Sequence, residues 1–151
     1  MAVSVLITQC LQNDFVKPIE AHEPLPNKLH VGREEATRLM GTDPTAGPVA
    51  QLMGWAREQA PESLHVIHIR DWHDPADARQ KDHLAMFGAH CVKGTPGAKL
   101  VLDLDDEVGS RRNEQLVDAI ALNDFEDTSL PGIIARIQAE AAGEPLRVGV
   151  V

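Results

Sequence analysis

Short runs of apolar, β-branched residues alternate with amphipathic stretches along this chain. Four such runs predict buried strands, and they lie at residues 3–8, 64–69, 117–122 and 146–151. Three amphipathic stretches predict helices, and they lie at residues 34–40, 48–59 and 133–142. Strands that alternate with helices form a parallel sheet, with ligands gathering beyond the carboxyl ends of the strands. We therefore expect an α/β protein, a Rossmann-like three-layer α/β/α domain with a mostly parallel sheet, spanning residues 1–151.

Two segments between these elements lack a regular pattern. Residues 17–27 contain three prolines, which predict a loop rather than a helix or strand. Residues 74–96 are polar and show little periodicity, so we expect an irregular segment there. A long irregular segment inside a small domain is usually functional when it is ordered.

The composition is typical of a globular protein, with more acidic than basic residues. The 151 residues include 14 Lys and Arg against 23 Asp and Glu, a formal charge of −9. This charge argues against nucleic acid or a membrane as the main partner, because both attract basic patches. No apolar run approaches the ~20 residues of a membrane helix. Cys10 and Cys91 are too few for a disulfide scaffold, so we expect a cytoplasmic protein with reduced thiols.

Side chains suited to binding a metal follow the second predicted strand. Asp71 and His73 are two positions apart, so in an extended backbone both project to the same side. His90 follows across the irregular segment, with His83 between them. One carboxylate and two imidazoles suit Zn, Fe or Mn, with water completing the shell. From spacing alone, the alternative is that Asp71 and His73 make caps and turn hydrogen bonds at the strand end.

Three segments resemble the isochorismatase-like cysteine hydrolases, a superfamily that includes the nicotinamidases. Residues 6–16, LITQCLQNDFV, resemble the opening strand and loop of the superfamily. Residues 70–73, RDWH, and 90–98, HCVKGTPGA, are closer still to the nicotinamidase branch. The resemblance implies that Asp71, His73 and His90 bind a divalent metal.

The resemblance also implies a reaction and a catalytic triad. The reaction is hydrolysis of a small amide or related C–N bond by a cysteine thiolate, assisted by an aspartate and a lysine. In this chain Cys10 occupies the aspartate position, and the lysine position falls at or near Ala119. The nucleophilic cysteine of the family belongs to a loop beyond Val151. The usual Asp-Lys-Cys triad is therefore not intact in these residues.

With the usual triad not intact, Cys10 is the remaining candidate for a catalytic residue. It is expected at the carboxyl end of the first strand, close to the chemistry of the family, where a reactive thiol is one interpretation. The other interpretation is a small residue that packs a strand end, since unactivated cysteines behave as inert hydrophobes.

Two aromatic residues are candidates for a substrate pocket. If the resemblance holds, Phe15 and Trp72 flank that pocket, where flat rings suit a planar heterocyclic amide. The alternative is that both side chains fill the core, as aromatic residues most often do.

These observations lead to three functional hypotheses. The first is a metal-assisted hydrolase of a small-molecule amide or related substrate. The second is a non-catalytic member of the fold that acts as a binding or assembly module, which Cys10 and Ala119 favour. The third is hydrolysis by metal-bound water without a thiol. A homo-oligomer is compatible with all three.

The number of predicted strands leads to an expectation about the C-terminal edge of the sheet. The resemblance implies a sheet of about six strands, whereas the hydrophobic pattern supplies about four. We therefore expect a domain that is incomplete at its C-terminus, the N-terminal portion of a longer hydrolase domain. An apolar sheet edge is then exposed near residues 148–151.

Overall fold

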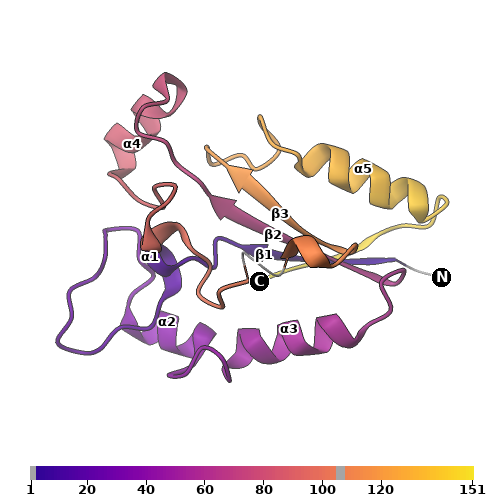
Figure 1. The fold of residues 1–151 in the computed structure, drawn as a ribbon, viewed down its shortest axis with the longest axis horizontal. Helices are drawn as coiled ribbons and strands as arrows, with labels where there is room; N and C mark the ends of the chain where they lie inside the picture. Colours follow the sequence, from indigo (N-terminus) through magenta and orange to yellow (C-terminus); the bar gives the residue numbers. More distant parts are fainter. Residues whose placement is uncertain (1–2, 105–107) are drawn as a thin grey trace.

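The centre of the molecule is a parallel sheet. The computed structural model describes residues 3–104 and 108–151, and these contain four paired strands. The strands are β1 (Ser4–Gln9), β2 (Leu64–Asp71), β3 (Glu114–Ala119) and β4 (Arg147–Val150), in the order β3-β2-β1-β4. Each pairing is parallel, and Figure 1 shows the sheet between its helices. The predicted α/β class and parallel sheet are confirmed.

The two central strands are apolar because they are covered on both faces. Strand β2 is buried from Leu64 to Arg70. It pairs with β1 from Ser4 opposite Leu64 to Gln9 opposite Ile69. A strand buried on both faces needs a nearly continuous apolar run rather than an alternating one, which is the pattern the sequence shows. The two strands end together, so the loops that follow them meet at one edge of the sheet.

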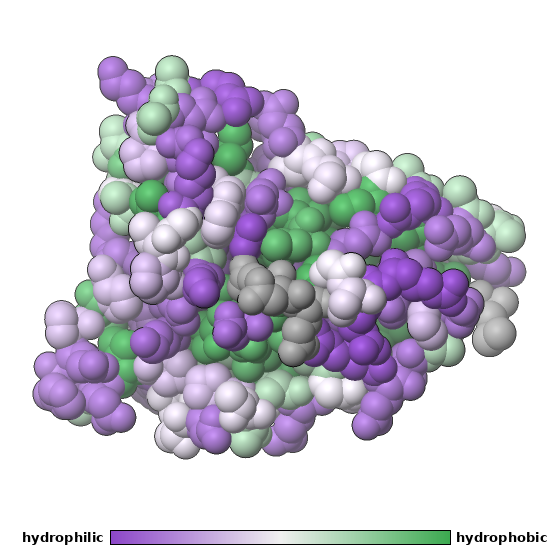
Figure 2. Space-filling model, in the orientation of Figure 1, coloured by the Kyte–Doolittle hydropathy of each residue, from purple (hydrophilic) through white to green (hydrophobic). Residues whose placement is uncertain are grey.

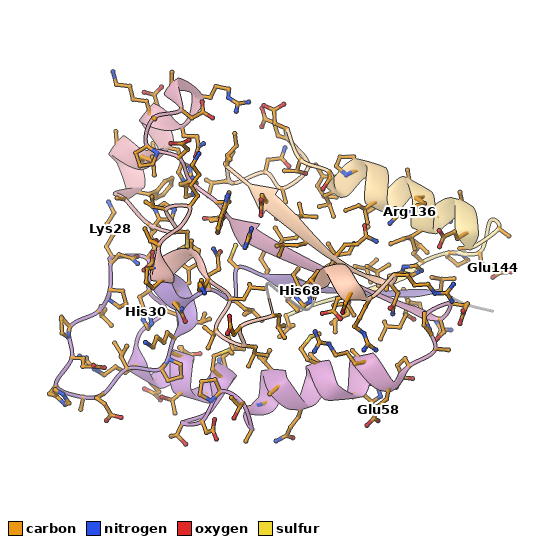
Figure 3. All side chains as sticks on the ribbon, in the orientation of Figure 1. Lys28, His30, Glu58, His68, Arg136 and Glu144 are labelled. Carbon is orange, nitrogen blue, oxygen red and sulfur yellow. The ribbon has the colours of Figure 1, made fainter. Side chains whose placement is uncertain are left out.

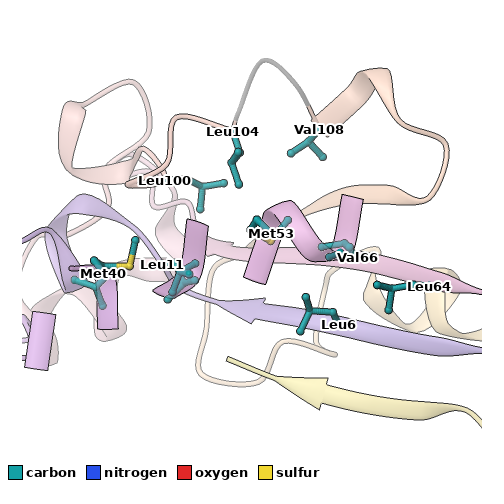
Figure 4. Close-up of a cluster of buried hydrophobic side chains, with 12 residues drawn as sticks. Leu6, Leu11, Met40, Met53, Leu64, Val66, Leu100, Leu104 and Val108 are labelled. Atoms are coloured by element: carbon teal, nitrogen blue, oxygen red, sulfur yellow. The ribbon is translucent and has the colours of Figure 1, made fainter. Parts of the chain in front are cut away.

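Helices cover both faces and make the three layers. Helices α2 (Arg33–Met40) and α3 (Pro48–Glu58) lie on one face, and α5 (Leu130–Glu140) lies on the other. Figure 4 shows the core on the first face, where Met53 of α3 packs near Leu6 and Val66 of the sheet. On the second face Ile133 and Ile137 of α5 join the buried valines and isoleucines of the strands. These two apolar layers hold the carboxyl ends of the strands in fixed positions.

Short elements occupy the loops between the strands and the longer helices. They are α1 (Asn13–Val16), η1 (Ala78–Gln80), α4 (Lys81–Phe87), η2 (Pro96–Ala98) and η3 (Val108–Ser110). The residues between Lys17 and Asn27 form no helix or strand, as predicted.

Two predicted elements need correction. The third strand was expected at residues 117–122 but runs from Glu114 to Ala119. Its first residues are polar, and Glu114 is buried because it is paired with Arg57 and His68. The segment 74–96 was expected to be irregular, yet it contains α4, a helix that buries none of its residues fully and therefore has no apolar stripe to reveal it.

The outer strands leave the two edges of the sheet open among the described residues. On β4 the residues Val148 and Val150 are 54% and 65% exposed. Strand β3 forms the opposite edge, beside α5. None of the helices in the described residues is long and apolar enough to cross a membrane.

Candidate metal centre

Asp71 ends β2 and is held there by a residue that follows β1. The Nε2 atom of Gln12 donates to the Asp71 carbonyl oxygen at 2.7 Å, and its Oε1 atom accepts from the Asp71 N–H at 2.8 Å. Gln12 is itself completely buried. The backbone of Asp71 is therefore fixed on both sides, and its carboxylate points beyond the strand end.

His73 and His90 are brought together by a short extension of the sheet. Beyond β2 the chain forms a parallel bridge between His73 and Val92. The His73 N–H donates to the Cys91 carbonyl oxygen at 3.0 Å, and the Lys93 N–H donates to the His73 carbonyl oxygen at 2.9 Å. This pairing places His90 beside His73, with ring centroids 4.5 Å apart.

A third histidine completes the group. His83 lies on α4, and its ring stacks on that of His73 with centroids 4.8 Å apart. One ring nitrogen from each of His73, His83 and His90 lies within 4.8 Å of the others. Asp71 Oδ2 is 3.4 Å from His73 Nε2 and 3.5 Å from His90 Nε2. Three imidazoles therefore cluster here, and the Asp71 carboxylate lies beside two of them.

Hydrogen bonds to carbonyl oxygens fix which nitrogen of two rings carries the proton. His73 Nδ1 lies 2.8 Å from Gln80 Oε1, and His90 Nδ1 lies 2.7 Å from the Gly88 carbonyl oxygen. Because a carbonyl oxygen only accepts, Nδ1 is the donor in both rings, and Nε2 keeps its lone pair when the ring is neutral. Such bonds commonly orient histidines that bind metals.

Two ring nitrogens of the cluster make no hydrogen bond in the part of the chain that the structure describes. Within the described residues, His73 Nε2 and His83 Nε2 are buried and make no hydrogen bond. Leaving a buried polar atom unpaired is costly, so such atoms need an explanation. A divalent cation satisfies both, and three imidazoles with a carboxylate are a typical ligand set for Zn, Fe or Mn. The residues present therefore fit a metal.

The electrostatics of the group also suit a cation. Burial alone raises the pKa of Asp71, but the contacts to His73 and His90 outweigh it and bring the pKa below its ordinary value. Burial lowers the pKa of His83, and the neighbouring imidazoles lower it further. At neutral pH the carboxylate is therefore charged and His83 is neutral, the states that bind metals.

The sequence reasoning identified three of these four side chains. Asp71, His73 and His90 are brought together, in keeping with the prediction of a metal site there. His83 was noted but given no role, since it lies on the helix α4 that the hydrophobic pattern does not reveal. Because α4 ends at Phe87, before His90, only the fold of the loop shows that the two rings meet.

Cys10 lies next to the centre with its thiol protonated. Its Sγ atom donates to Asp71 Oδ1 at 3.6 Å and accepts from Gln9 Nε2 at 3.3 Å. Burial and the charge of Asp71 raise the pKa of Cys10 to about 12. The nucleophilic form of a cysteine is the thiolate, which this environment disfavours. Cys91 is fully buried, and burial raises the pKa of its thiol as well.

A carboxyl group that the sequence reasoning did not select approaches from the loop after β3. Asp124 is partly buried. Burial raises its pKa, the charge of Asp71 raises it further, and a hydrogen bond from Gln9 acts in the opposite direction. Ala119, at the expected lysine position, is fully buried at the end of β3 and offers only a methyl group.

The two aromatic candidates have different surroundings. Phe15 packs against the core cluster that includes Met40 of α2, and its ring lies 5.6 Å from that of His90. Trp72 is partly exposed, and the guanidinium of Arg70 lies over its ring at 3.7 Å from the centroid. Phe87 of α4 packs on His83 at 4.8 Å. The role of Phe15 and Trp72 in a substrate pocket stays a prediction.

Several solved structures share this architecture. The nicotinamidase/pyrazinamidase from Bacillus subtilis is 20% identical, and the superposition covers 99% of this chain and 71% of that one with a TM-score of 0.67. An isochorismatase-like hydrolase from Alkaliphilus metalliredigens is 20% identical, with 99% and 68% covered and a TM-score of 0.65. The chain has the isochorismatase-like hydrolase fold. The resemblance seen in the sequence motifs is therefore confirmed at the level of the fold.

One further structure with this fold is relevant to the histidine cluster. The pyrazinamidase of Pyrococcus horikoshii was solved in complex with zinc, and it is 19% identical to this chain. The superposition covers 98% of this chain and 70% of that one, with a TM-score of 0.54. No protein-family model and no curated protein sequence matches this chain.

Proposed function

We propose that this protein is a metal-dependent hydrolase of a small carboxamide or a related C–N bond. The observation that carries the proposal is the cluster of His73, His83 and His90, in which, among the described residues, His73 Nε2 and His83 Nε2 are buried and make no hydrogen bond. The isochorismatase-like fold supports it, because the similar structures include nicotinamidases and a pyrazinamidase with zinc.

The metal would be held by Asp71, His73, His83 and His90. When bound, a divalent ion polarises a carbonyl or lowers the pKa of a water molecule, which is the chemistry that amide hydrolysis needs. The residues of the chain hold this centre rigid. Gln12 fixes Asp71, and Gln80 and the Gly88 carbonyl oxygen orient the two imidazoles. Small-molecule substrates then enter beyond the carboxyl ends of β1 and β2, as is usual for parallel sheets.

Proton transfer is assigned to a carboxyl group rather than to a thiol. Amide hydrolysis needs a group that takes up a proton from water and returns it to the leaving nitrogen. Asp124 has a pKa raised by burial and lies near Gln9 and the charge of Asp71. Cys10 is protonated at neutral pH. We infer that Asp124 performs this transfer and that Cys10 contributes little to it.

The second candidate function is a binding module without catalysis. It is favoured by Cys10 and Ala119, because neither residue supplies the group that the corresponding family position requires. Such a protein retains the fold and the metal and lacks turnover, so the two candidates differ in activity and agree in metal content.

Metal content is the first test. Purified protein is expected to contain about one Zn, Fe or Mn ion per chain. The variants His73→Ala and His83→Ala should lose it, while His22→Ala, an exposed histidine in a distant loop, should retain it. Folding of each variant is checked by circular dichroism. A folded protein that binds no divalent metal, even when titrated, overturns the assignment of the centre.

Ammonia release from nicotinamide and a panel of simple carboxamides is the second test. The proposal predicts turnover by the metal-loaded protein, retention of most of it in Cys10→Ser, and a fall of roughly 100-fold or more in Asp124→Asn. Loss of turnover in Cys10→Ser, with metal still bound, would assign the reaction to the thiol. Absence of turnover across the panel, with metal bound, supports the binding module instead.

A further inference from the structure

The edge of the sheet formed by β3 has backbone groups available for pairing. Among the described residues β3 pairs only with β2. The Val66 N–H donates to the Asn113 carbonyl oxygen, and the Trp72 N–H donates to the Ala119 carbonyl oxygen. In a parallel pair alternate residues face the partner strand, so the odd-numbered residues of β3 bond to β2. The N–H and C=O groups of Leu116 and Asp118 therefore point away from the sheet.

This edge lies at the bottom of a groove. One wall is formed by α5 and the other by η3 and the residues that follow it. The groove has a volume of about 660 Å³ and is open to solvent along its length. Its apolar lining consists of Val108, Leu116 and Ile133. Figure 2 shows green apolar surface over the region where β3 runs beside α5, with purple hydrophilic residues around it.

Three arginines line the same groove in a chain whose net charge is −9. They are Arg111, Arg112 and Arg136, with side chains 38%, 69% and 54% exposed. Figure 3 labels Arg136 on α5. The three guanidinium groups lie beside one edge strand, so the groove is rich in positive charge although the protein as a whole is acidic. Such a surface attracts a negatively charged partner.

The arginines have local partners that leave donors available. Arg112 pairs with Glu62, and Arg136 Nε lies 3.9 Å from Glu140 Oε1. Arg111 donates to the Arg57 carbonyl oxygen at 2.8 Å and lies 3.5 Å from Glu114. A guanidinium has five N–H donors, so one carboxylate does not saturate it. Exposed ion pairs of this kind are also weak and exchange readily for another carboxylate.

We propose that the β3 edge binds an extended acidic peptide segment of a partner protein, which adds a strand to the sheet. Addition of a strand to an exposed edge is a common mode of peptide recognition, in which the main chain gives affinity and alternate side chains give specificity. Here Leu116 and Asp118 supply the main-chain bonds, and acidic side chains of the peptide contact the arginines. This interaction is independent of the proposed hydrolase activity.

A labelled peptide tests the proposal directly. The probe is a fluorescein-labelled hexapeptide of alternating glutamate and valine, and the matched control replaces each glutamate with lysine. Fluorescence anisotropy with the full chain should show binding of the acidic peptide at least roughly tenfold tighter than the basic one. A third peptide with N-methylated backbone amides has the same charge and should bind roughly tenfold more weakly, because it lacks donors for the strand pairing. Equal binding of all three peptides, or no binding of the acidic one, overturns the proposal.

Charge-reversed variants test the location of the site. Arg112→Glu combined with Arg136→Glu should weaken binding of the acidic peptide by roughly tenfold or more. Both side chains are exposed, so the fold should persist, and thermal unfolding checks this. The matched control is Arg38→Glu, an exposed arginine on α2 paired with Glu35, which should leave binding unchanged. An equal loss in the control assigns the effect to overall charge and overturns the proposal.

Amide hydrogen exchange measured by NMR tests the strand pairing itself. The amides of Leu116 and Asp118 point outward and should become protected when the acidic peptide binds, whereas those of Gln115 and Val117, already bonded to β2, should change little. Size-exclusion chromatography with light scattering accompanies this experiment. A dimer of the chain that protects the same two amides without peptide would mean that a second copy occupies the edge, and would overturn the proposal.

Discussion

The side chain of Gln12 makes hydrogen bonds to both the N–H and the carbonyl oxygen of Asp71. Its amide nitrogen donates to the Asp71 carbonyl oxygen at 2.7 Å, while its amide oxygen accepts from the Asp71 N–H at 2.8 Å. The same nitrogen donates to the Ala98 carbonyl oxygen at 2.8 Å. One buried side chain therefore joins the end of β1, the end of β2 and the turn η2, and it determines where the Asp71 carboxylate points.

Replacing Gln12 with alanine should loosen the metal centre and destabilise the fold. The change leaves buried backbone groups of Asp71 and Ala98 without partners, which lowers the free energy of unfolding by about 3 kcal/mol. Metal affinity should fall roughly 10–100-fold, as it does when groups that orient ligands are lost. Urea unfolding and a competitive chelator titration measure the two effects. Gln51→Ala, an exposed glutamine on α3, is the control and should change neither quantity.

Gln80 allows a test of how His73 is oriented. Gln80 is buried, and its Oε1 atom accepts from His73 Nδ1 at 2.8 Å. Gln80→Leu removes the acceptor and should weaken metal binding roughly 10–100-fold, whereas Gln80→Glu retains an acceptor and should bind metal nearly as well as the unmodified protein. The measurement is the same chelator competition. Equal affinities for the two variants would show that this hydrogen bond does not orient the ligand.

Gly97 is required because Asp14 occupies the space of its missing side chain. A Cβ atom at this position would lie 2.3 Å from Asp14 Oδ2, the atom that accepts from the Cys91 N–H next to His90. Gly97→Ala should therefore lower the free energy of unfolding by about 1–3 kcal/mol and weaken metal binding. In a double-mutant cycle, Asp14→Ala should be less destabilising in the Gly97→Ala background than in the unmodified protein. Gly132→Ala on α5, where no atom lies within 4 Å, should be neutral or stabilising.

The hydrophobic pattern of the sequence located best those strands whose residue types are determined by burial. The apolar runs located β1 and β2, because a parallel strand covered on both faces has little choice of residue type. The run at β4 was located as well, although its four residues are exposed in the structure. The start of β3 was placed three residues too late, since Glu114 is polar and its burial depends on Arg57 and His68 from other elements. Pairing between distant residues leaves no local pattern to detect.

The residues of the candidate metal centre also differ in whether the sequence could predict them. Asp71 and His73 follow a strand that the pattern predicts, and His90 was a candidate from the sequence that the resemblance then supported. His83 and Gln80 belong to short helices that bury little surface, so their contribution depends on how the loop folds over the strand ends. The role of Gln12 leaves no local pattern in the sequence, since its hydrogen bonds join residues about sixty and ninety positions away.

Glu114 should make stability depend on pH in the acid range. Its side chain is 1% exposed and pairs with His68 Nε2 at 2.9 Å and with Arg57 at 2.7 Å. Burial raises its pKa, but these two partners outweigh burial and lower the pKa from 4.5 to about 2. The folded state therefore binds the proton less readily than the unfolded state. The stabilisation is fully present above about pH 4.5 and is lost as the pH falls toward 2.

Glu114→Gln removes this titration and tests the sign. From the difference of the two pKa values, the unmodified protein should exceed the variant in free energy of unfolding by about 3 kcal/mol near pH 6. This difference should shrink steadily in urea unfolding curves recorded between pH 4.5 and pH 2.5. Glu58→Gln, on the exposed side of α3, provides the matched substitution, and its difference from the unmodified protein should stay near zero throughout. A Glu114→Gln difference that stays constant or grows as the pH falls would contradict the burial of a charged Glu114 between His68 and Arg57.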